Sequence, residues 1–302
     1  MSTKKKVLIG LGIYALINVA MIVIFGSDGK NDAFQPQNEF KLDNWVEITI
    51  AGIDMSINKA VLYLVLAATM TCVTMIFIAN RMAAKPNRVQ MAVELAYDVT
   101  KNMIVGDNMQ EKWAKRWFGF IASLFFFIWF SNMIGLIPLP TNTEHKVDIF
   151  GIEFPSFALY AATANISLPL VLATVVCTTY HLEGVREHGP INYLGSFLPS
   201  GLETMPAIGK VLIWVIELIS HTVRLISLSV RLFANILAGH LLILFMGGGL
   251  AVLLGLAALG TISFPLVVAF YAFEVGLVAT LQAFIFSILT AIYIGSATSH
   301  GH

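Results

Sequence analysis

Two arginines seven residues apart, Arg224 and Arg231, lie in an apolar stretch without proline between Pro206 and Pro265. At about 3.6 residues per turn they share one helix face with four other polar residues, namely Glu217, Ser220, Ser227 and Asn235. A guanidinium inside a membrane costs about 3 kcal/mol or more, and it cannot avoid that cost by losing its proton. A polar stripe of this kind therefore indicates an ion path.

Two other interpretations of the stripe are open. It could be a buried structural network, in which Glu217 neutralises one arginine and Ser227 satisfies main-chain carbonyl groups. A voltage sensor fits less well, because only two arginines are present and they are mixed with amides and acids. From Glu217 to Asn235 the stripe rises about 27 Å, close to the hydrocarbon thickness of a bilayer, which favours the ion path.

Composition places the chain among membrane proteins. Of its 302 residues 57% are hydrophobic and 12% charged, and the mean hydropathy is +0.80. The formal net charge is zero, so no basic surface argues for a nucleic-acid partner. Cys72 and Cys177 lie in apolar runs, and the histidines lack the spacing of metal ligands. We therefore predict an all-α polytopic membrane protein without cofactor or metal.

The apolar runs predict about five or six transmembrane helices. Single spans are expected at residues 7–25, 60–79, 117–138 and 157–179, the last with a kink at Pro169. The first run begins after three lysines, so it is either a retained anchor or a signal peptide. Residues 86–106 are too polar to span and are expected to lie in the membrane interface.

Two longer runs follow near the C-terminal end. A helix over residues 206–246 would be about 60 Å long, roughly twice what an upright crossing needs. A turn at residues 247–249 and a second long run over 250–294, bent by Pro265, complete a tilted helical hairpin. The return arm carries Glu274 and Gln282 within the apolar run.

The distribution of charge predicts the topology, and the chain is divided into two parts. Residues 81–116 are rich in lysine and arginine, which places them in the cytoplasm together with the C-terminus. Residues 139–156 are acidic and are expected outside. An inner loop after residue 179 is expected to contain His181 and His188. We divide the chain into an N-terminal extension, residues 1–44, and a membrane domain, residues 45–302.

Two motifs carry a resemblance to a known family. They are Ser227-Leu-Ser-Val-Arg-Leu-Phe-Ala-Asn-Ile-Leu-Ala-Gly-His240 and Leu281-Gln-Ala-Phe-Ile-Phe286. With them, the chain resembles subunit a of the rotary F-type ATP synthase over residues 45–298. Supporting matches are Pro86, Gln90, Glu94, Asn132, Pro138, Asn165, Ser167, Glu217 and Ser220.

The resemblance implies a non-catalytic stator subunit of the membrane Fo sector, with two proton half-channels that couple ion flow to rotation. Its expected partners are a c-subunit ring, a b-subunit peripheral stalk and the lipid of a bacterial plasma (inner) membrane. Arg231 corresponds to the family's essential arginine. The other path residues are expected to be Asn235, Gln282, Glu217, His240, Glu274 and Ser227, with secondary candidates at Asn165, Ser220 and Arg224.

The sequence departs from the family pattern in three places. Thr163 stands where many relatives carry aspartate, and His240 stands where some carry glutamate. Glu274 precedes Gln282 by eight residues, whereas an ionisable residue seven before it is common, and that place is taken by Val275. Because His240 points away from the stripe on an ideal helix, we predict that it forms a titrating pair with Glu274.

The implied transported ion is H+ or Na+, and no other small-molecule substrate is expected. The alternative function is a stand-alone secondary transporter or ion channel. A transporter would more often show an inverted repeat, and none is evident in the sequence. A channel would need a pore made by this chain alone or by several copies of it.

Overall fold

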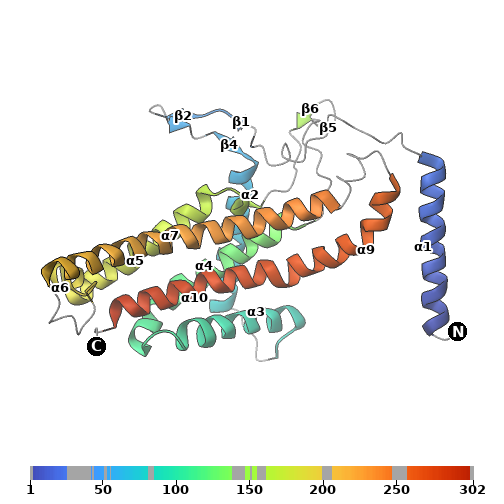
Figure 1. Ribbon diagram of the computed structural model, residues 1–302. Coiled ribbons are helices and arrows are strands. Elements are labelled where there is room, and N and C mark those ends of the chain that lie inside the picture. Colours follow the sequence, from blue (N-terminus) through green and yellow to red (C-terminus); the bar gives the residue numbers. More distant parts are fainter. Residues whose placement is uncertain are drawn as a thin grey trace. The chain divides into compact units, whose positions relative to one another are not determined.

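The fold is seen in a computed structural model of the chain, which divides into two compact units (Figure 1). The structure describes residues 3–25, 42, 44–50, 53–54, 56–80, 85–137, 147–149, 152–154, 161–198, 206–246 and 257–299. Unit 1 comprises Met1–Lys59, Pro138–Leu159 and Leu237–Val278. Unit 2 comprises Ala60–Ile137, Tyr160–Ile236 and Ala279–His302.

Helices make up most of the described chain. The α-helices are α1 (Thr3–Phe25), α2 (Lys59–Asn80), α3 (Arg88–Asp98), α4 (Glu111–Gly135), α5 (Ser167–His188), α6 (Pro190–Gly195), α7 (Ala207–Leu244), α9 (Ala257–Phe273) and α10 (Ala279–Thr298). Three short segments have another helical geometry: the π-helical η2 (Val99–Gly106) and η5 (Glu274–Val278), and the 3-10 helix η3 (Ala162–Ala164).

Short strands, which the sequence did not predict, occur between the helices. They are β1 (Asn44–Val46), β2 (Thr49–Ile50), β3 (Ile53–Asp54), β4 (Ile57–Asn58), β5 (Val147–Ile149) and β6 (Ile152–Phe154). They form three antiparallel pairs, β1 with β4, β2 with β3 and β5 with β6. Each strand has only two or three residues, so the pairs satisfy main-chain groups of connecting segments without forming a sheet core.

Five helical stretches are long and apolar enough to cross a membrane, which confirms the all-α polytopic prediction. They are Lys59–Asn80, Glu111–Gly135, Ser167–His188, Ala207–Leu244 and Ser263–Thr298. The last two are the overlong stretches that the sequence predicted. The predicted apolar run at residues 7–25 also forms a helix, α1, which packs against α9 within unit 1.

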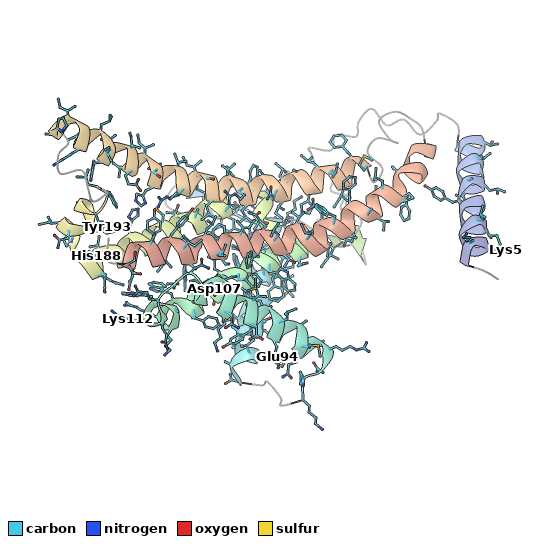
Figure 2. The ribbon with its side chains drawn as sticks, turned by 60° about the horizontal axis from the view of Figure 1, so that its bottom comes forward. Lys5, Glu94, Asp107, Lys112, His188 and Tyr193 are labelled. Atoms are coloured by element: carbon cyan, nitrogen blue, oxygen red, sulfur yellow. The ribbon has the colours of Figure 1, made fainter. Side chains whose placement is uncertain are left out.

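The segment after α2, which was predicted to lie in the membrane interface, is helical and is not among the five spanning stretches. Asn87 begins α3, because its side-chain Oδ1 accepts a hydrogen bond of 2.8 Å from the Gln90 main-chain nitrogen. One turn further on, Gln90 Nε2 donates to Glu94 Oε1 at 2.6 Å, and Figure 2 shows Glu94 on this helix. The final turns, η2, are π-helical, a geometry that the sequence did not indicate.

The fourth predicted single span, residues 157–179, is displaced along the chain. Helix α5 begins at Ser167 and not at residue 157, and residues just before it form η3. Pro169 therefore lies in the first turn, where a missing N–H leaves no helix hydrogen bond unmade, and the predicted kink is wrong. The prediction missed this start because the residues before Ser167 are, taken together, as apolar as those of the helix that follows.

The far end of α5 also corrects a prediction. His181 and His188 belong to the helix and not to an inner loop. Helix α5 stops at Gly189, whose φ of 80° suits glycine, and Pro190 then begins α6 at its first position. Two acidic side chains near this end form ion pairs with basic residues of α4, at 2.8 Å between Arg116 and Glu183 and at 3.6 Å between Lys112 and Glu187.

The C-terminal return arm runs without a break through α9, η5 and α10. Pro265 lies inside α9, whose ribbon changes direction along its length, in agreement with the predicted bend (Figure 1). The predicted turn at residues 247–249 lies outside the described residues.

The core of unit 2 forms where α10 packs against α4 and α5. Fully buried side chains from these helices include Phe126, Ile128 and Phe286. Polar contacts tie the same helices together. Trp129 Nε1 donates to Thr280 Oγ1 at 3.2 Å, for example, and Asn132 Nδ2 donates to the main-chain oxygen of Ala279 at 3.4 Å.

A close approach at Gly295 yields a test of this packing. A Cβ at this position would lie 2.6 Å from the main-chain oxygen of Asn108, which cannot swing aside as a side chain can. We expect Gly295→Ala to destabilise the subunit by about 1–3 kcal/mol and to lower its amount in membranes. Gly119→Ala on α4 is the control, because a Cβ there meets nothing within 4 Å. Equal amounts of both variants, measured by immunoblot, would contradict this packing.

Candidate ion-translocation site

Helix α7 positions the polar stripe and leaves much of its own surface uncovered. A narrow row of side chains one turn apart, Leu228, Leu232 and Ile236, is buried against the rest of unit 2. Other apolar side chains, including Val223 and Val230, are exposed. A helix that crosses a membrane with an exposed apolar face can meet lipid or a partner protein there.

Arg231 is exposed on α7 and makes no hydrogen bond or ion pair with any residue that the structure describes. The other arginine of the stripe behaves differently. Arg224 Nη2 donates to Glu217 Oε1 at 3.4 Å, and its guanidinium lies 5.7 Å from the centre of the Tyr293 ring. The interpretation as a structural network thus fits Arg224, whereas Arg231 has a charge that this part of the chain does not compensate.

Asn235, one turn beyond Arg231, links α7 to α10. Its Nδ2 donates a hydrogen bond of 2.8 Å to Gln282 Oε1. Gln282 is 2% exposed, and its Nε2 has no hydrogen-bond partner among the described residues. The structure therefore brings the predicted side chains of Asn235 and Gln282 together, and the buried Nε2 of Gln282 remains free to donate a hydrogen bond.

Glu217 lies in the first half of α7, and two side chains of the same helix approach its carboxylate. Its Oε1 accepts from Arg224, and it also lies 3.8 Å from Nε2 of His221, one turn further along the helix. About a third of its side chain is exposed, so the carboxylate stays open to exchange. Glu217 is thus a hydrogen-bonded carboxylate on the predicted stripe.

The remaining predicted polar residues of unit 2 have local roles or no partner. Ser227 is exposed, and neither it nor Ser220 makes a hydrogen bond within the part of the chain that the structure describes. Asn165 Oδ1 accepts from the main-chain nitrogen of Ser167 at 3.0 Å, so it shapes the start of α5 and does not bond to another helix. Thr163, two residues before Asn165, makes the hydrogen bond that links η3 to α4. Its hydroxyl donates to Asn132 Oδ1 at 2.7 Å.

In unit 1, Glu274 begins the π-helical η5 and is 7% exposed. Its carboxyl group fills the space where a side chain at Gly239 would begin. The neighbouring His240 was predicted to pair with Glu274, but the structure does not join them. Both His240 Nε2 and Glu274 Oε2 are buried without a hydrogen-bond partner among the described residues.

The π-helical turn also explains the unusual spacing of Glu274. A π turn closes its hydrogen bonds one residue later than an α turn, so each such turn adds a residue to the helix. The extra residue therefore shifts the helical register of the residues on one side of η5 by one position relative to those on the other side. A spacing of eight residues across η5 therefore corresponds to seven residues in an unbroken α-helix, the spacing that the family resemblance led us to expect.

The sequence reasoning missed a second cluster, which surrounds His221. The Tyr180 hydroxyl lies 3.0 Å from His221 Nδ1, and the Tyr193 hydroxyl lies 2.8 Å from His181 Nδ1. Burial raises the pKa of Tyr193, which lies outside the spanning helices, to about 12. One signal was available, because His221 follows Glu217 by four residues and must share its helix face.

Among the described residues, no three or more His, Cys, Asp or Glu side chains are grouped in a way that could hold a metal ion. The arrangement offers proton donors, proton acceptors and one uncompensated cation. Such groups can bind and pass protons, and an exposed guanidinium can attract a carboxylate from another molecule.

A family model and several known proteins match most of the chain, and their descriptions agree. Residues 61–295 match the family model described as ATP synthase A chain. The relatives named ATP synthase subunit a include one from Rubrobacter xylanophilus, 38% identical over 83% of this chain and 88% of the relative. Another, from Beijerinckia indica, is 32% identical over 88% of this chain and 97% of the relative. A third, from Pelagibacter ubique, is 34% identical over 89% of this chain and 100% of the relative.

These matches span nearly all of the membrane helices and both polar motifs. The chain, a multi-pass membrane protein, belongs to the ATP synthase A chain family.

Proposed function

We propose that the chain is the Fo stator subunit that provides two proton half-channels and couples proton flow to rotation of a c-subunit ring. The observation that carries the proposal is Arg231, exposed on the polar stripe of an otherwise apolar helix and without a hydrogen bond or ion pair in the described chain. An uncompensated guanidinium facing lipid would be costly. The cost is removed when a carboxylate on a neighbouring subunit lies opposite it.

The mechanism follows from the cost of burying charge. A carboxylate on the ring can face lipid only in its protonated form, because an ionised carboxylate is strongly disfavoured there. Beside Arg231 the ionised form becomes favourable, so the proton leaves. Once past the arginine, the carboxylate must take up another proton before it faces lipid again. Arg231 therefore drives proton release and also prevents protons from passing directly between the half-channels.

Asn235 and Gln282 support this role from beside the arginine. Their 2.8 Å hydrogen bond fixes α7 against α10 one turn from Arg231. The free Nε2 of Gln282 is a buried donor, and it can stabilise a carboxylate or a water molecule that approaches. Ser227, exposed on the same stripe, supplies a hydroxyl that can do likewise.

We assign Glu217 to one half-channel and Glu274, with His240, to the other. In the sequence, Glu217 comes after the basic ends of α4 and α5. The charge pattern predicts that these ends lie in the cytoplasm, so we assign the Glu217 half-channel to that side. The C-terminus is cytoplasmic as well in this proposal. Ser220 and Arg224 support the Glu217 group, whereas Asn165 is left with a local structural role.

The chain makes and breaks no covalent bond in this proposal, so it is not itself a catalyst. It acts with the ring and with a b-subunit peripheral stalk that holds it still, in a bacterial plasma (inner) membrane. A transmembrane potential of 100 mV contributes about 2.3 kcal/mol for each proton that crosses, and rotation is driven by that energy.

A reconstitution experiment separates this function from a stand-alone channel or transporter. We expect the purified chain alone to leave vesicles proton-tight, because its arginine lacks the moving carboxylate that carries protons past it. Adding the c ring should restore proton uptake, measured by a pH-sensitive dye under an imposed potential. Proton conduction by the chain alone at the rate of the full assembly would overturn the proposal.

A further inference from the structure

The cluster around His221 consists of two histidine–tyrosine pairs in unit 2 that meet through ring contacts. It starts at Glu217, whose Oε1 lies 3.8 Å from His221 Nε2. The other ring nitrogen of His221, Nδ1, lies 3.0 Å from the Tyr180 hydroxyl. His221 therefore faces a carboxylate with one nitrogen and a phenol with the other, which is the arrangement of a residue that passes protons.

A second histidine–tyrosine pair continues the cluster. The ring centroids of His181 and His221 are 5.0 Å apart, and those of Tyr180 and His181 are 4.3 Å apart. His181 Nδ1 then lies 2.8 Å from the Tyr193 hydroxyl on α6. Figure 2 shows Tyr193 and His188 toward one end of the helices, close to where α5 gives way to α6. The pairs thus lead from Glu217 toward the end of the spanning helices.

Packing holds these rings in place. Tyr180 and Tyr193 are almost fully buried, and the ring of Tyr193 occupies the space that a side chain at Gly184 would need. Phe197 closes the cluster with an edge-on contact to Tyr193 and a tilted contact to His221. Because burial keeps the Tyr193 hydroxyl protonated, it can both accept and donate a hydrogen bond.

We propose that His221, Tyr180, His181 and Tyr193 form a proton relay that connects Glu217 with the aqueous phase at the α6 end of the helices. This inference rests on the proposed function and adds four residues to one half-channel. When Glu217 releases its proton, the His221 ring takes up one proton at Nε2 and releases one from Nδ1. The ring then has the same number of protons as before. The Tyr180 hydroxyl takes up the released proton and gives up its own, a water molecule carries that proton past the ring contact to His181, and His181 passes it to the Tyr193 hydroxyl.

A purely structural role is the competing explanation, because aromatic rings of this size also stabilise helix packing. The two explanations differ for variants that keep the ring and remove only the hydroxyl. Tyr180→Phe and Tyr193→Phe preserve the packing contacts but delete one hydrogen-bonding group each. A relay is interrupted by this change, whereas a packing cluster is not.

The test uses the whole ATP synthase reconstituted into vesicles, with ATP synthesis driven by an imposed pH difference and potential. We expect each of His221→Ala, Tyr180→Phe and Tyr193→Phe to lower the rate at least about tenfold at an unchanged subunit content. His188→Ala is the matched control, because it removes a histidine from the same helix end outside the relay, and its rate should stay near wild type.

Chemical rescue of His221→Ala identifies the relay more sharply. Imidazole, with two exchangeable nitrogens, should restore part of the rate, and 1-methylimidazole, in which one nitrogen is blocked, should not. Equal rescue by both compounds would show that the ring only fills space, and would overturn the relay. Wild-type rates in both phenylalanine variants would overturn it as well, even if His221→Ala fails to assemble.

The outcomes for Arg231 keep the relay and the proposed function apart. If Arg231→Ala is inactive while the relay variants work normally, the relay is wrong and the proposed function stands. If Arg231→Ala retains wild-type synthesis, the proposed function fails, whatever the relay variants do.

Discussion

Replacing Arg231 by alanine is expected to abolish ATP synthesis driven by a proton gradient while the complex still assembles. The side chain is exposed and makes no hydrogen bond or ion pair with the described residues, so its loss should leave the packing of α7 unchanged. Without it, no positive charge on the stripe faces the ring carboxylate at this depth, and the neutral donors that remain are too weak to make it release its proton. Arg231→Lys should also fail, because an ammonium does not reproduce the planar fork of donors.

The measurement is ATP synthesis in inverted membrane vesicles, with subunit content checked by immunoblot. Arg224→Gln offers a matched comparison on the same helix. Because Arg224 already has Glu217 as its partner, we expect this variant to retain part of the activity. Synthesis near the wild-type rate in Arg231→Ala would refute the assigned role.

The second large effect is expected at Glu274. If its carboxyl group carries protons in the other half-channel, Glu274→Gln should lower synthesis by about tenfold or more, because the amide cannot release a proton. Gly239→Ala should act through the same group. The added methyl would occupy the place of the Glu274 carboxyl, a flexible side-chain end that can move away without unfolding the helix.

Gly276→Ala provides the control for this experiment, since a Cβ at that position in the same π-helical segment meets nothing within 4 Å. The comparison of rates at equal subunit content is the measurement. A Glu274→Gln variant with unchanged synthesis would remove Glu274 from the path. An inactive Gly276→Ala would show that the segment responds to any added methyl group.

Much of this architecture could be predicted because membrane helices are long and strongly apolar. The overlong α7 and the return arm followed from the lengths of their apolar runs, and the Asn235–Gln282 contact joins residues from the two predicted motifs. The start of α5 could not be found in this way. The residues before Ser167 are as apolar as the helix itself, so hydropathy carries no boundary signal there.

The parts of the site that were missed depend on contacts between distant residues. Tyr180 and His221 lie on different helices, 41 residues apart, and nothing in either local sequence indicates that their polar atoms meet. The separate roles of Arg224 and Arg231 were hidden for a similar reason. The two share one face of an ideal helix, and only the position of Glu217 and Tyr293 around Arg224 distinguishes them.

The uncompensated charge of Arg231 also bears on biogenesis. A newly inserted copy that has not met the ring holds a guanidinium against acyl chains, which favours local thinning of the bilayer or entry of water. We expect such a copy to be less stable in the membrane than the assembled subunit and to be degraded by membrane proteases. The same arginine thus makes the lifetime of the subunit depend on its assembly, which limits how much unassembled chain a cell accumulates.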